Sequence, residues 1–93
     1  MREGFREAVE AAVRSLQPGE VVSYSEIAQQ AGFPGAARGV GGVLRDAGAG
    51  VPWWRVVAAD GRLVAPSADE QAKRLRAEGV VVRDGRVRVV LAD

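Results

Sequence analysis

The chain has 93 residues, 47% of them hydrophobic, and a net charge of +1, which together predict one globular domain over residues 1–93. Because it contains no cysteine and no histidine, the composition excludes disulfides, thiol nucleophiles, cysteine–zinc sites and histidine general bases. No apolar run approaches the roughly 18 residues of a membrane span and the N-terminus is too acidic for a signal peptide, so we expect a cytoplasmic protein without a membrane partner.

A first amphipathic helix is predicted over residues 5–16, where apolar side chains recur at helical spacing. A short extended piece is expected at residues 21–22. Ser23 and Glu26 have the spacing of a capping box, which predicts that a second helix begins after Ser23. The sequence GFPG at residues 32–35 should end that helix sharply.

The third predicted helix, residues 36–47, has an unusual outer face. Arg38 and Arg45 lie seven residues apart on the side opposite the apolar stripe, with Gly41 and Gly42 between them. Each interior glycine costs up to about 1 kcal/mol relative to alanine. A thin face that lets the backbone approach a ligand accounts for the exposed pair better than packing does. Two short helices joined by a glycine-containing turn predict a helix-turn-helix.

The second half of the chain mixes extended and helical patterns. Residues 54–58 and 63–64 are expected to be extended, and adjacent tryptophans on such a strand should point to opposite faces. Ser67 with Glu70 has capping-box spacing and predicts a last helix that stops at Gly79.

The C-terminal sequence VVVRDGRVRVV predicts a β-hairpin, because Asp84-Gly85 is a strong two-residue turn signal between β-branched segments. Helices followed by a hairpin indicate a small α+β winged helix-turn-helix domain with a C-terminal β-hairpin.

The basic residues are unevenly distributed. Between residues 27 and 59 there are three arginines, Arg38, Arg45 and Arg55, and a single acid, Asp46. Such a local excess is typical of a phosphate-binding face, although charge alone favours this no more than ordinary surface scatter.

No local motif supports catalysis, a cofactor or a metal site. The carboxylates form no suggestive pair, and the glycines match neither a phosphate loop nor a dinucleotide fingerprint. The third helix has few long polar side chains to read the major groove, whereas small residues suit the narrower minor groove, where base identity is poorly read. Two DNA-binding hypotheses stay open: a lesion binder, and a winged-helix regulator or nucleoid protein without lesion specificity.

Four stretches carry a family resemblance: GEVVSYSEIAQQAG, PGAARGVGGVLRDAG, VPWWRVVAADGRL and QAKRLRAEGV. In order and spacing they resemble the DNA-binding domain of O6-alkylguanine-DNA alkyltransferases, and most closely the non-enzymatic alkyltransferase-like proteins. Those enzymes carry Pro-Cys-His-Arg-Val at the active site, where this chain has Trp53 at the Cys position and Trp54 at the His position. The resemblance implies a protein that flips O6-alkylguanine out of duplex DNA, holds it without repair and marks it for nucleotide-excision repair.

The resemblance also implies roles for individual residues. Tyr24 would press the phosphate of the target nucleotide, and Arg38 would enter the base stack. Arg55 and Glu78 would brace the site, with the indole N–H of Trp54 as a candidate donor to Glu78. The lesion pocket would be lined by Val51, Pro52, Trp53, Ala65, Pro66 and Ser67, and the remaining DNA contacts would come from Ser23, Ala36, Ala37, Gly41, Gly42 and Arg45.

Each role has a structural alternative. Tyr24 could pack on the core, Arg38 could be a solvated surface residue, Arg55 could serve structure alone, and Glu78 could merely close the last helix. The expected partners are double-stranded DNA containing O6-alkylguanine and the damage-recognition proteins of nucleotide-excision repair. A monomer is expected, associated with the nucleoid if the source is bacterial.

Overall fold

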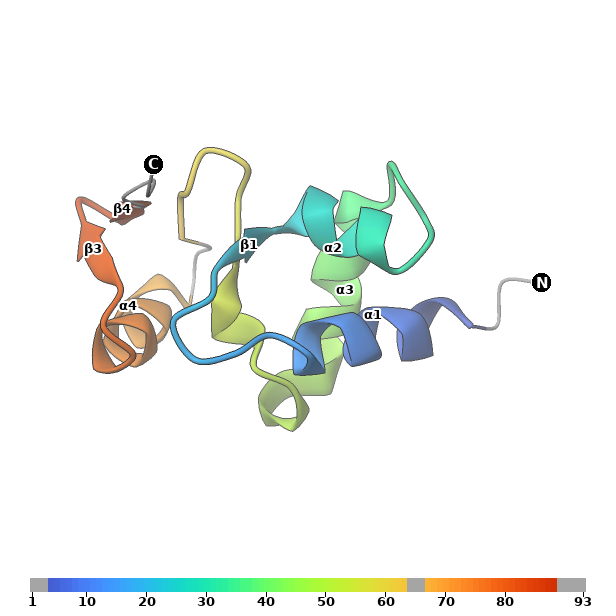
Figure 1. Cartoon of the computed structure of the whole chain (residues 1–93), viewed down its shortest axis with the longest axis horizontal. Helices are drawn as coiled ribbons and strands as arrows, with labels where there is room; N and C mark the ends of the chain where they lie inside the picture. The colour runs from blue at the N-terminus through green and yellow to red at the C-terminus, as the bar shows by residue number, and fades with distance from the viewer. Residues whose placement is uncertain (1–3, 64–66, 89–93) are drawn as a thin grey trace.

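The computed structural model describes residues 4–63 and 67–88. The chain forms two groups of elements around a short central β-pair (Figure 1). None of the helices in this part of the chain is long and apolar enough to cross a membrane. The elements are, in order, α1 (Phe5–Arg14), β1 (Val22–Ser23), α2 (Tyr24–Gln30), α3 (Ala37–Ala47), the 3-10 turns η1 (Gly48–Gly50) and η2 (Trp53–Arg55), β2 (Val56–Val57), α4 (Ala68–Ala77), β3 (Val81–Arg83) and β4 (Arg86–Arg88).

The three N-terminal helices pack around one hydrophobic cluster. Val9 and Val13 of α1, Ile27 of α2 and Val40 of α3 are fully buried in it. These residues lie at the helical spacing seen in the sequence, so each helix turns one apolar face inward. The predicted first and third helices are therefore confirmed, with ends one or two residues inside the expected bounds.

The helix-turn-helix is formed by α2 and α3, and both ends of α2 are set by local chemistry. The Ser23 hydroxyl accepts from the Glu26 amide at 3.1 Å, and the Glu26 carboxylate accepts from the Ser23 amide at 2.7 Å, which confirms the capping box. At the other end Gly32 has φ +92°, a left-handed conformation that favours glycine and ends the helix. The chain then reverses into α3.

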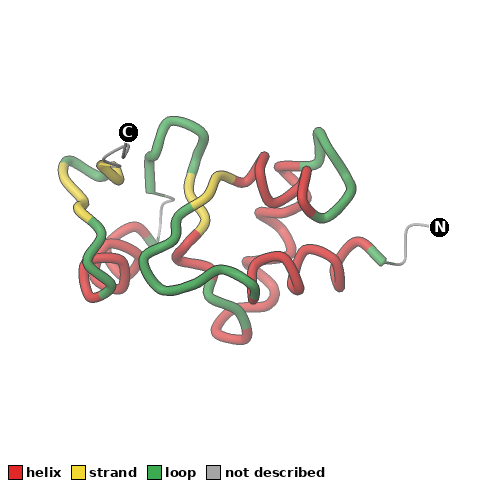
Figure 2. The backbone as a smooth tube through the Cα atoms, viewed as in Figure 1, coloured by secondary structure: helices red, strands yellow, loops and turns green. Residues whose placement is uncertain are grey.

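A second cluster is formed by residues of α4, of the C-terminal hairpin and of the segment between them and β2. In the backbone trace α4 and the hairpin lie at the end of the molecule away from α1 (Figure 2). Leu75 of α4 is fully buried there, and Val82 and Val87 enter it from β3 and β4. The strands pair antiparallel, with Val82 opposite Val87. Asp84 and Gly85 both have positive φ, 55° and 71°, as a type I′ turn requires, so the predicted hairpin is confirmed.

The parallel pair of β1 and β2 joins the group of three N-terminal helices to the group formed by α4 and the hairpin. Val22 lies opposite Val56, and Ser23 opposite Val57. Val56 belongs to the first cluster and Val57 to the second, because successive residues of a strand point to opposite sides. This short pair therefore fixes the helix-turn-helix relative to α4 and the hairpin.

The capping box predicted at the start of α4 is wrong. Ser67 is the N-cap residue but its side chain makes no capping hydrogen bond. The Glu70 carboxylate instead accepts from Arg74 Nε at 2.8 Å, one helical turn further on. The Glu70 side chain therefore forms an i,i+4 ion pair on an exposed face and does not form the bond to the N-cap backbone that a capping box requires.

Candidate nucleic-acid interface

The outer face of α3 carries a stripe made of Arg38, Gly41, Gly42 and Arg45, called the α3 stripe below. Residues three, four and seven positions apart lie on one side of a helix, so the two arginines flank the two glycines over roughly 10 Å. Both arginines are exposed. Within the described ranges neither has a carboxylate within 4.0 Å.

The glycines of α3 divide by environment. A Cβ on Gly41 or Gly42 would meet nothing within 4 Å outside its own helix, whereas a Cβ on Gly39 would lie 3.0 Å from Cζ of Phe5. Close packing against α1 therefore explains Gly39, and it does not explain the pair in the α3 stripe. The backbone of that pair is open to a ligand, as the sequence suggested.

Tyr24 stands beside this stripe as the first residue of α2. Its ring is half-buried and packs against the first hydrophobic cluster. Burial raises the pKa of the Tyr24 phenol, and the nearby positive charge of Arg45 partly offsets the rise. The phenol is thus neutral near pH 7, able to donate a hydrogen bond, and held in place by its own packing.

The other residues predicted on this face lie at the starts of the two helices. Ser23 caps α2, and its hydroxyl oxygen is already engaged by Glu26. Ala36 is the N-cap of α3 and Ala37 its first residue, both half-buried and without a long side chain. Backbone can therefore approach this corner closely.

Trp53 is presented by a tight turn rather than by a strand. Pro52 has φ −76° and ψ 66°, the values of an inverse γ-turn, and the Trp53 amide donates to the Val51 carbonyl at 2.7 Å. A 3-10 turn, η2, follows from Trp53 to Arg55. The expectation that residues 54–58 are extended is thus wrong at its start, because the strand begins only at Val56.

The two tryptophans nevertheless divide between the clusters. Trp53 packs against the first and Trp54 against the second. Both are half-buried, and their rings meet edge to face with centroids 6.1 Å apart. The guanidinium groups of Arg55 and Arg74 lie 5.2 Å and 4.7 Å from the Trp54 ring centroid, within cation–π range. Packing, the indole hydrogen bond and the two guanidinium groups therefore hold the Trp54 ring in place.

Behind this turn, Arg55 and Glu78 form a nearly buried ion pair, with side chains 12% and 13% exposed. Arg55 donates to the Glu78 carboxylate through Nη2 at 2.7 Å, and to the Leu16 carbonyl through Nη1 at 3.0 Å. Glu78 also accepts from the Trp54 indole and from the Gly19 amide, each at 2.8 Å. The hydrogen bonds from Arg55 lower the pKa of Glu78 most, and those from the Gly19 amide and the Trp54 indole lower it further. Burial of the carboxylate raises the pKa, but the net result is a pKa of about 2.

Two sequence-based expectations are settled by this network. Trp54 does donate its indole N–H to Glu78. Arg55 does not add to the basic face, because its charge is taken up internally by Glu78. The positive charge of the α3 region therefore rests on Arg38 and Arg45.

Gln71 of α4 is a site residue that the sequence did not reveal. It is 1% exposed, and its side-chain amide donates to the carbonyls of Trp54 at 3.1 Å and Val56 at 2.9 Å. These bonds hold the exit of η2 against α4. The sequence contains one indication of this role: Gln71 is polar, yet it lies on the apolar face of the helix that also carries Ala68, Ala72 and Leu75.

The remaining predicted pocket residues have mixed placements. Val51 is 2% exposed and belongs to the first cluster, so it supports the Trp53 turn from within. Ser67 is exposed at the start of α4. Ala65 and Pro66 lie outside the described residues.

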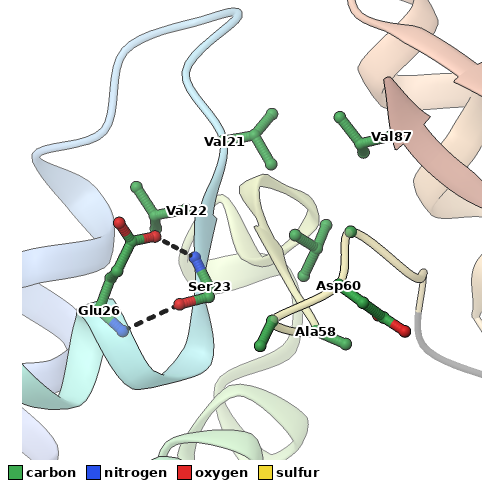
Figure 3. Close-up of a pocket in the computed structure, with 10 residues that line it drawn as sticks. Val21, Val22, Ser23, Glu26, Ala58, Asp60 and Val87 are labelled. Atoms are coloured by element: carbon green, nitrogen blue, oxygen red, sulfur yellow. Dashed lines mark hydrogen bonds between the residues drawn. The ribbon is translucent and has the colours of Figure 1, made fainter. Parts of the chain in front are cut away.

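A pocket of about 290 Å³ lies elsewhere, between β1, the segment after β2 and the hairpin (Figure 3). Val21 and Val87 approach it from opposite sides, and the Ser23–Glu26 capping box forms one wall. No residue of 51–55 lines it, so it is separate from the Trp53 turn. The part of the chain that the structure describes contains no group of acidic side chains able to hold a metal ion.

Together these elements define a small helix-turn-helix domain that presents one thin, basic helix face next to a tryptophan-bearing turn. Residues 4–80 match the family described as the DNA-binding domain of 6-O-methylguanine DNA methyltransferase. A DNA base-flipping protein of Vibrio parahaemolyticus is 38% identical over 78 residues, which cover 80% of this chain and 78% of the relative. A DNA base-flipping protein of Escherichia coli is 40% identical over 84 residues; the match covers 86% of this chain and 65% of that relative.

Solved structures agree with this assignment. Atl1 of S. pombe, in complex with damaged DNA containing O6-carboxymethylguanine, superposes with a TM-score of 0.84 at 30% identity, covering 95% of this chain and 90% of Atl1. The O6-methylguanine methyltransferase of Mycobacterium tuberculosis gives a TM-score of 0.72 at 36% identity, and the match spans 80% of this chain but only 47% of that enzyme. The chain therefore belongs to the methyltransferase DNA-binding domain family, as one of its alkyltransferase-like members.

Proposed function

We propose that this protein binds double-stranded DNA through the minor groove, flips O6-alkylguanine out of the stack and holds it against Trp53 without repairing it. The observation that carries the proposal is the half-buried Trp53, set on a γ-turn beside the helix-turn-helix, in a chain without any cysteine. The printed names of relatives, DNA base-flipping proteins and an Atl1 complex with alkylated DNA, support the same activity.

The α3 stripe provides the DNA contact. Gly41 and Gly42 let the helix backbone enter a narrow groove, and Arg38 and Arg45 at either side neutralise phosphates or enter the duplex. Arg38, exposed near the start of α3 and without a carboxylate partner among the described residues, fills the space that the flipped nucleotide leaves. A flip costs a few kcal/mol, least for a base whose pairing is already damaged, so part of the selectivity lies in the DNA.

Tyr24 acts on the phosphate of the flipped nucleotide. Its neutral phenol donates a hydrogen bond to a phosphate oxygen. Because the ring packs against the first cluster, the side chain keeps its position when the phosphate presses on it. The positive charge of Arg45 close by adds attraction for the same phosphate.

Trp53 holds the base and cannot react with it. A flat indole stacks on a base for about 1–3 kcal/mol, but it is no acceptor for an alkyl group, a step that requires a thiolate or comparable nucleophile. Recognition thus replaces chemistry at this position, and the protein is not an enzyme. The retained lesion is then passed to damage-recognition proteins of nucleotide-excision repair, with the protein bound as a monomer.

A flipping assay tests the proposal. Duplexes carrying guanine or O6-methylguanine beside a fluorescent base analogue are titrated with the protein and with three variants. We expect the wild-type protein to prefer the lesion and to raise fluorescence as the base leaves the stack. Tyr24→Phe and Arg38→Ala should reduce flipping, and Trp53→Ala should reduce the lesion preference.

The outcome also decides between the two DNA-binding hypotheses. Equal affinity of the wild-type protein for both duplexes would exclude lesion recognition. It would favour the hypothesis of a winged-helix regulator or nucleoid protein without lesion specificity. Mass measurement of protein and DNA after incubation checks the absence of chemistry, because loss of the methyl group from the DNA would contradict simple retention. Faster lesion incision by a reconstituted excision-repair system on addition of the protein would support the hand-over.

A further inference from the structure

The exposed face of the C-terminal hairpin carries four arginines, Arg62, Arg83, Arg86 and Arg88, called the wing face below. Arg83 lies directly opposite Arg86 in the β3–β4 ladder. Arg62 forms an isolated antiparallel bridge with Arg86 on its other side. Residues directly opposite one another share a face of a sheet, so three of these guanidinium groups stand in one row across three chain segments.

This arrangement works against the stability of the hairpin. Like charges directly opposite each other destabilise an antiparallel pair. Two aspartates offset part of the repulsion: Asp60 lies 3.5 Å from Arg62 and 3.4 Å from Arg86, and Asp84 lies 3.9 Å from Arg88. Arg83 has no carboxylate within 4.0 Å among residues 4–63 and 67–88. Four arginines against two aspartates leave the wing face positive.

The wing face is available to a partner. The side chains of Arg62, Arg86 and Arg88 are 66%, 44% and 45% exposed, and Arg83 is exposed as well. The inward positions of the same strands, Val82 and Val87, supply the core. The outward arginines are therefore not needed to bury the hairpin, and stability alone does not account for them.

We propose that the wing face is a second DNA contact, which binds backbone phosphates of the duplex that α3 holds. Arginine is suited to bidentate pairing with phosphate, and a row of guanidinium groups without base-reading side chains would bind irrespective of sequence. The proposal rests on the proposed function for the identity of the polyanion. It extends the binding surface from the helix-turn-helix to the far end of the molecule.

The dimensions of the protein allow this. The hairpin lies at one end of the long axis and α3 nearer its middle, with the β1–β2 pair and the segment after β2 between them (Figure 1). That axis is 40 Å long, which corresponds to about 12 base pairs of B-DNA at roughly 3.4 Å per step. A duplex of that length is long enough to run from α3 to the hairpin. A contact at each end would also orient the protein along the DNA while the α3 stripe acts on the lesion.

The test is a salt titration of DNA affinity for Arg83→Gln/Arg86→Gln. Duplexes of about 20 base pairs, with guanine or O6-methylguanine at the centre, are used. Removing two phosphate contacts should weaken binding roughly tenfold at low salt, equally for both duplexes, and should reduce the slope of log K against log salt by about 1.8. Because the change removes a like-charge pair, the melting temperature should stay level or rise.

Arg14→Gln/Lys73→Gln is the matched control, since it makes the same change of net charge on exposed parts of α1 and α4, where Arg14 lies beside Glu10. If both double variants lose the same DNA affinity, the loss is explained by net charge alone and the proposal is overturned. Unchanged DNA binding by the Arg83→Gln/Arg86→Gln variant would also overturn the proposal. If this variant binds DNA normally but no longer binds polyglutamate, the wing face would instead be a contact for an acidic protein. Failure of the proposed function is a separate result, seen as equal affinity of the wild-type protein for both duplexes.

Discussion

The indole Nε1 of Trp54 lies 2.8 Å from Oε2 of Glu78 and donates a hydrogen bond to it. The same carboxylate holds Arg55 and the Gly19 amide, so one acid at the end of α4 ties together η2 and the loop after α1. By the family resemblance, Trp54 is expected at the position where the alkyltransferase enzymes carry a histidine. In this chain the donor to Glu78 is an indole N–H, which does not act as an acid or a base near neutral pH.

Replacing Glu78 by glutamine should weaken the protein mainly at neutral pH. The pKa of Glu78 is about 2 in the folded protein against 4.5 for the free side chain. Because the folded pKa is depressed, the stabilisation is complete above about pH 4.5 and is lost as the pH falls toward 2. We expect a loss on the order of 2 kcal/mol in the free energy of unfolding at pH 7, with allowance for residual solvent screening. Urea unfolding from pH 2 to 7 measures it.

The sign of the pH dependence distinguishes this ion pair from a general effect of mutation. The stabilities of wild type and Glu78→Gln should approach one another as the pH falls to about 2. Glu70→Gln is a suitable control, because its carboxylate pairs with Arg74 on an exposed face and its side chain is 51% exposed, where such pairs contribute little. A constant difference between wild type and Glu78→Gln across the whole pH range would refute the assignment.

The Gln71 side chain is predicted to set the position of the Trp53 turn. Gln71→Leu removes the donors to the Trp54 and Val56 carbonyls and leaves buried acceptors unpaired, at a cost of about 2 kcal/mol. The preference for O6-methylguanine should fall more than the affinity for undamaged DNA, because the α3 stripe is untouched. Denaturant unfolding and paired DNA titrations measure the two effects. Equal losses for both duplexes would reduce Gln71 to a purely structural role.

Helix caps, tight turns and buried helix faces can be predicted from the sequence where residues close together in the chain determine them. Ser23 and Glu26 form the capping box, and Asp84-Gly85 the hairpin turn, because each device needs only residues a few positions apart. The apolar spacing of α1 and α3 fixed which faces are buried. The family motifs predict roles for the α3 stripe and for Trp53, and those roles stay predictions.

Long-range contacts account for what the sequence did not reveal. The turn at Trp53 depends on Gln71, 17 residues from Trp54 in the chain, and no local rule predicts that partner. The Ser67 box failed because Arg74 competes for Glu70. The wing face follows from strand register, which places Arg83 against Arg86 and Arg86 against Arg62. Tertiary pairing decides these features, and a spacing argument along one segment cannot.

Introducing a thiol at position 53 alone should not produce alkyl transfer. In Trp53→Cys the neighbour Trp54 offers only an N–H donor, and Glu78 with a pKa of about 2 is too weak a base to activate a thiol. Incubation with O6-methylguanine DNA should leave the mass of the variant almost unchanged. Trp53→Cys/Trp54→His adds an imidazole beside Glu78 and should gain the methyl group faster. Rapid methylation of the single variant would show that the surroundings of Trp53 activate a thiol by other means.

Gly41 and Gly42 of α3 are predicted to lower the stability of the helix while favouring DNA binding. A methyl group at Gly42 meets nothing within 4 Å outside its helix, so Gly42→Ala should raise the free energy of unfolding by about 0.5–1 kcal/mol through helix propensity. The same methyl thickens the surface that enters the groove, so affinity for every duplex should fall, independent of the lesion. Thermal unfolding and DNA titration of one preparation give both quantities.

Gly39→Ala separates the two causes, since its methyl group would lie 3.0 Å from the Phe5 ring. That contact forces the ring to shift, so the gain in stability should be smaller than for Gly42→Ala or absent. Gly39 is not in the α3 stripe, and its replacement should leave DNA affinity close to wild type. If Gly42→Ala raises stability and leaves DNA affinity unchanged, the helix does not approach the duplex through this face, and Arg38 must then reach the stack from another orientation of α3.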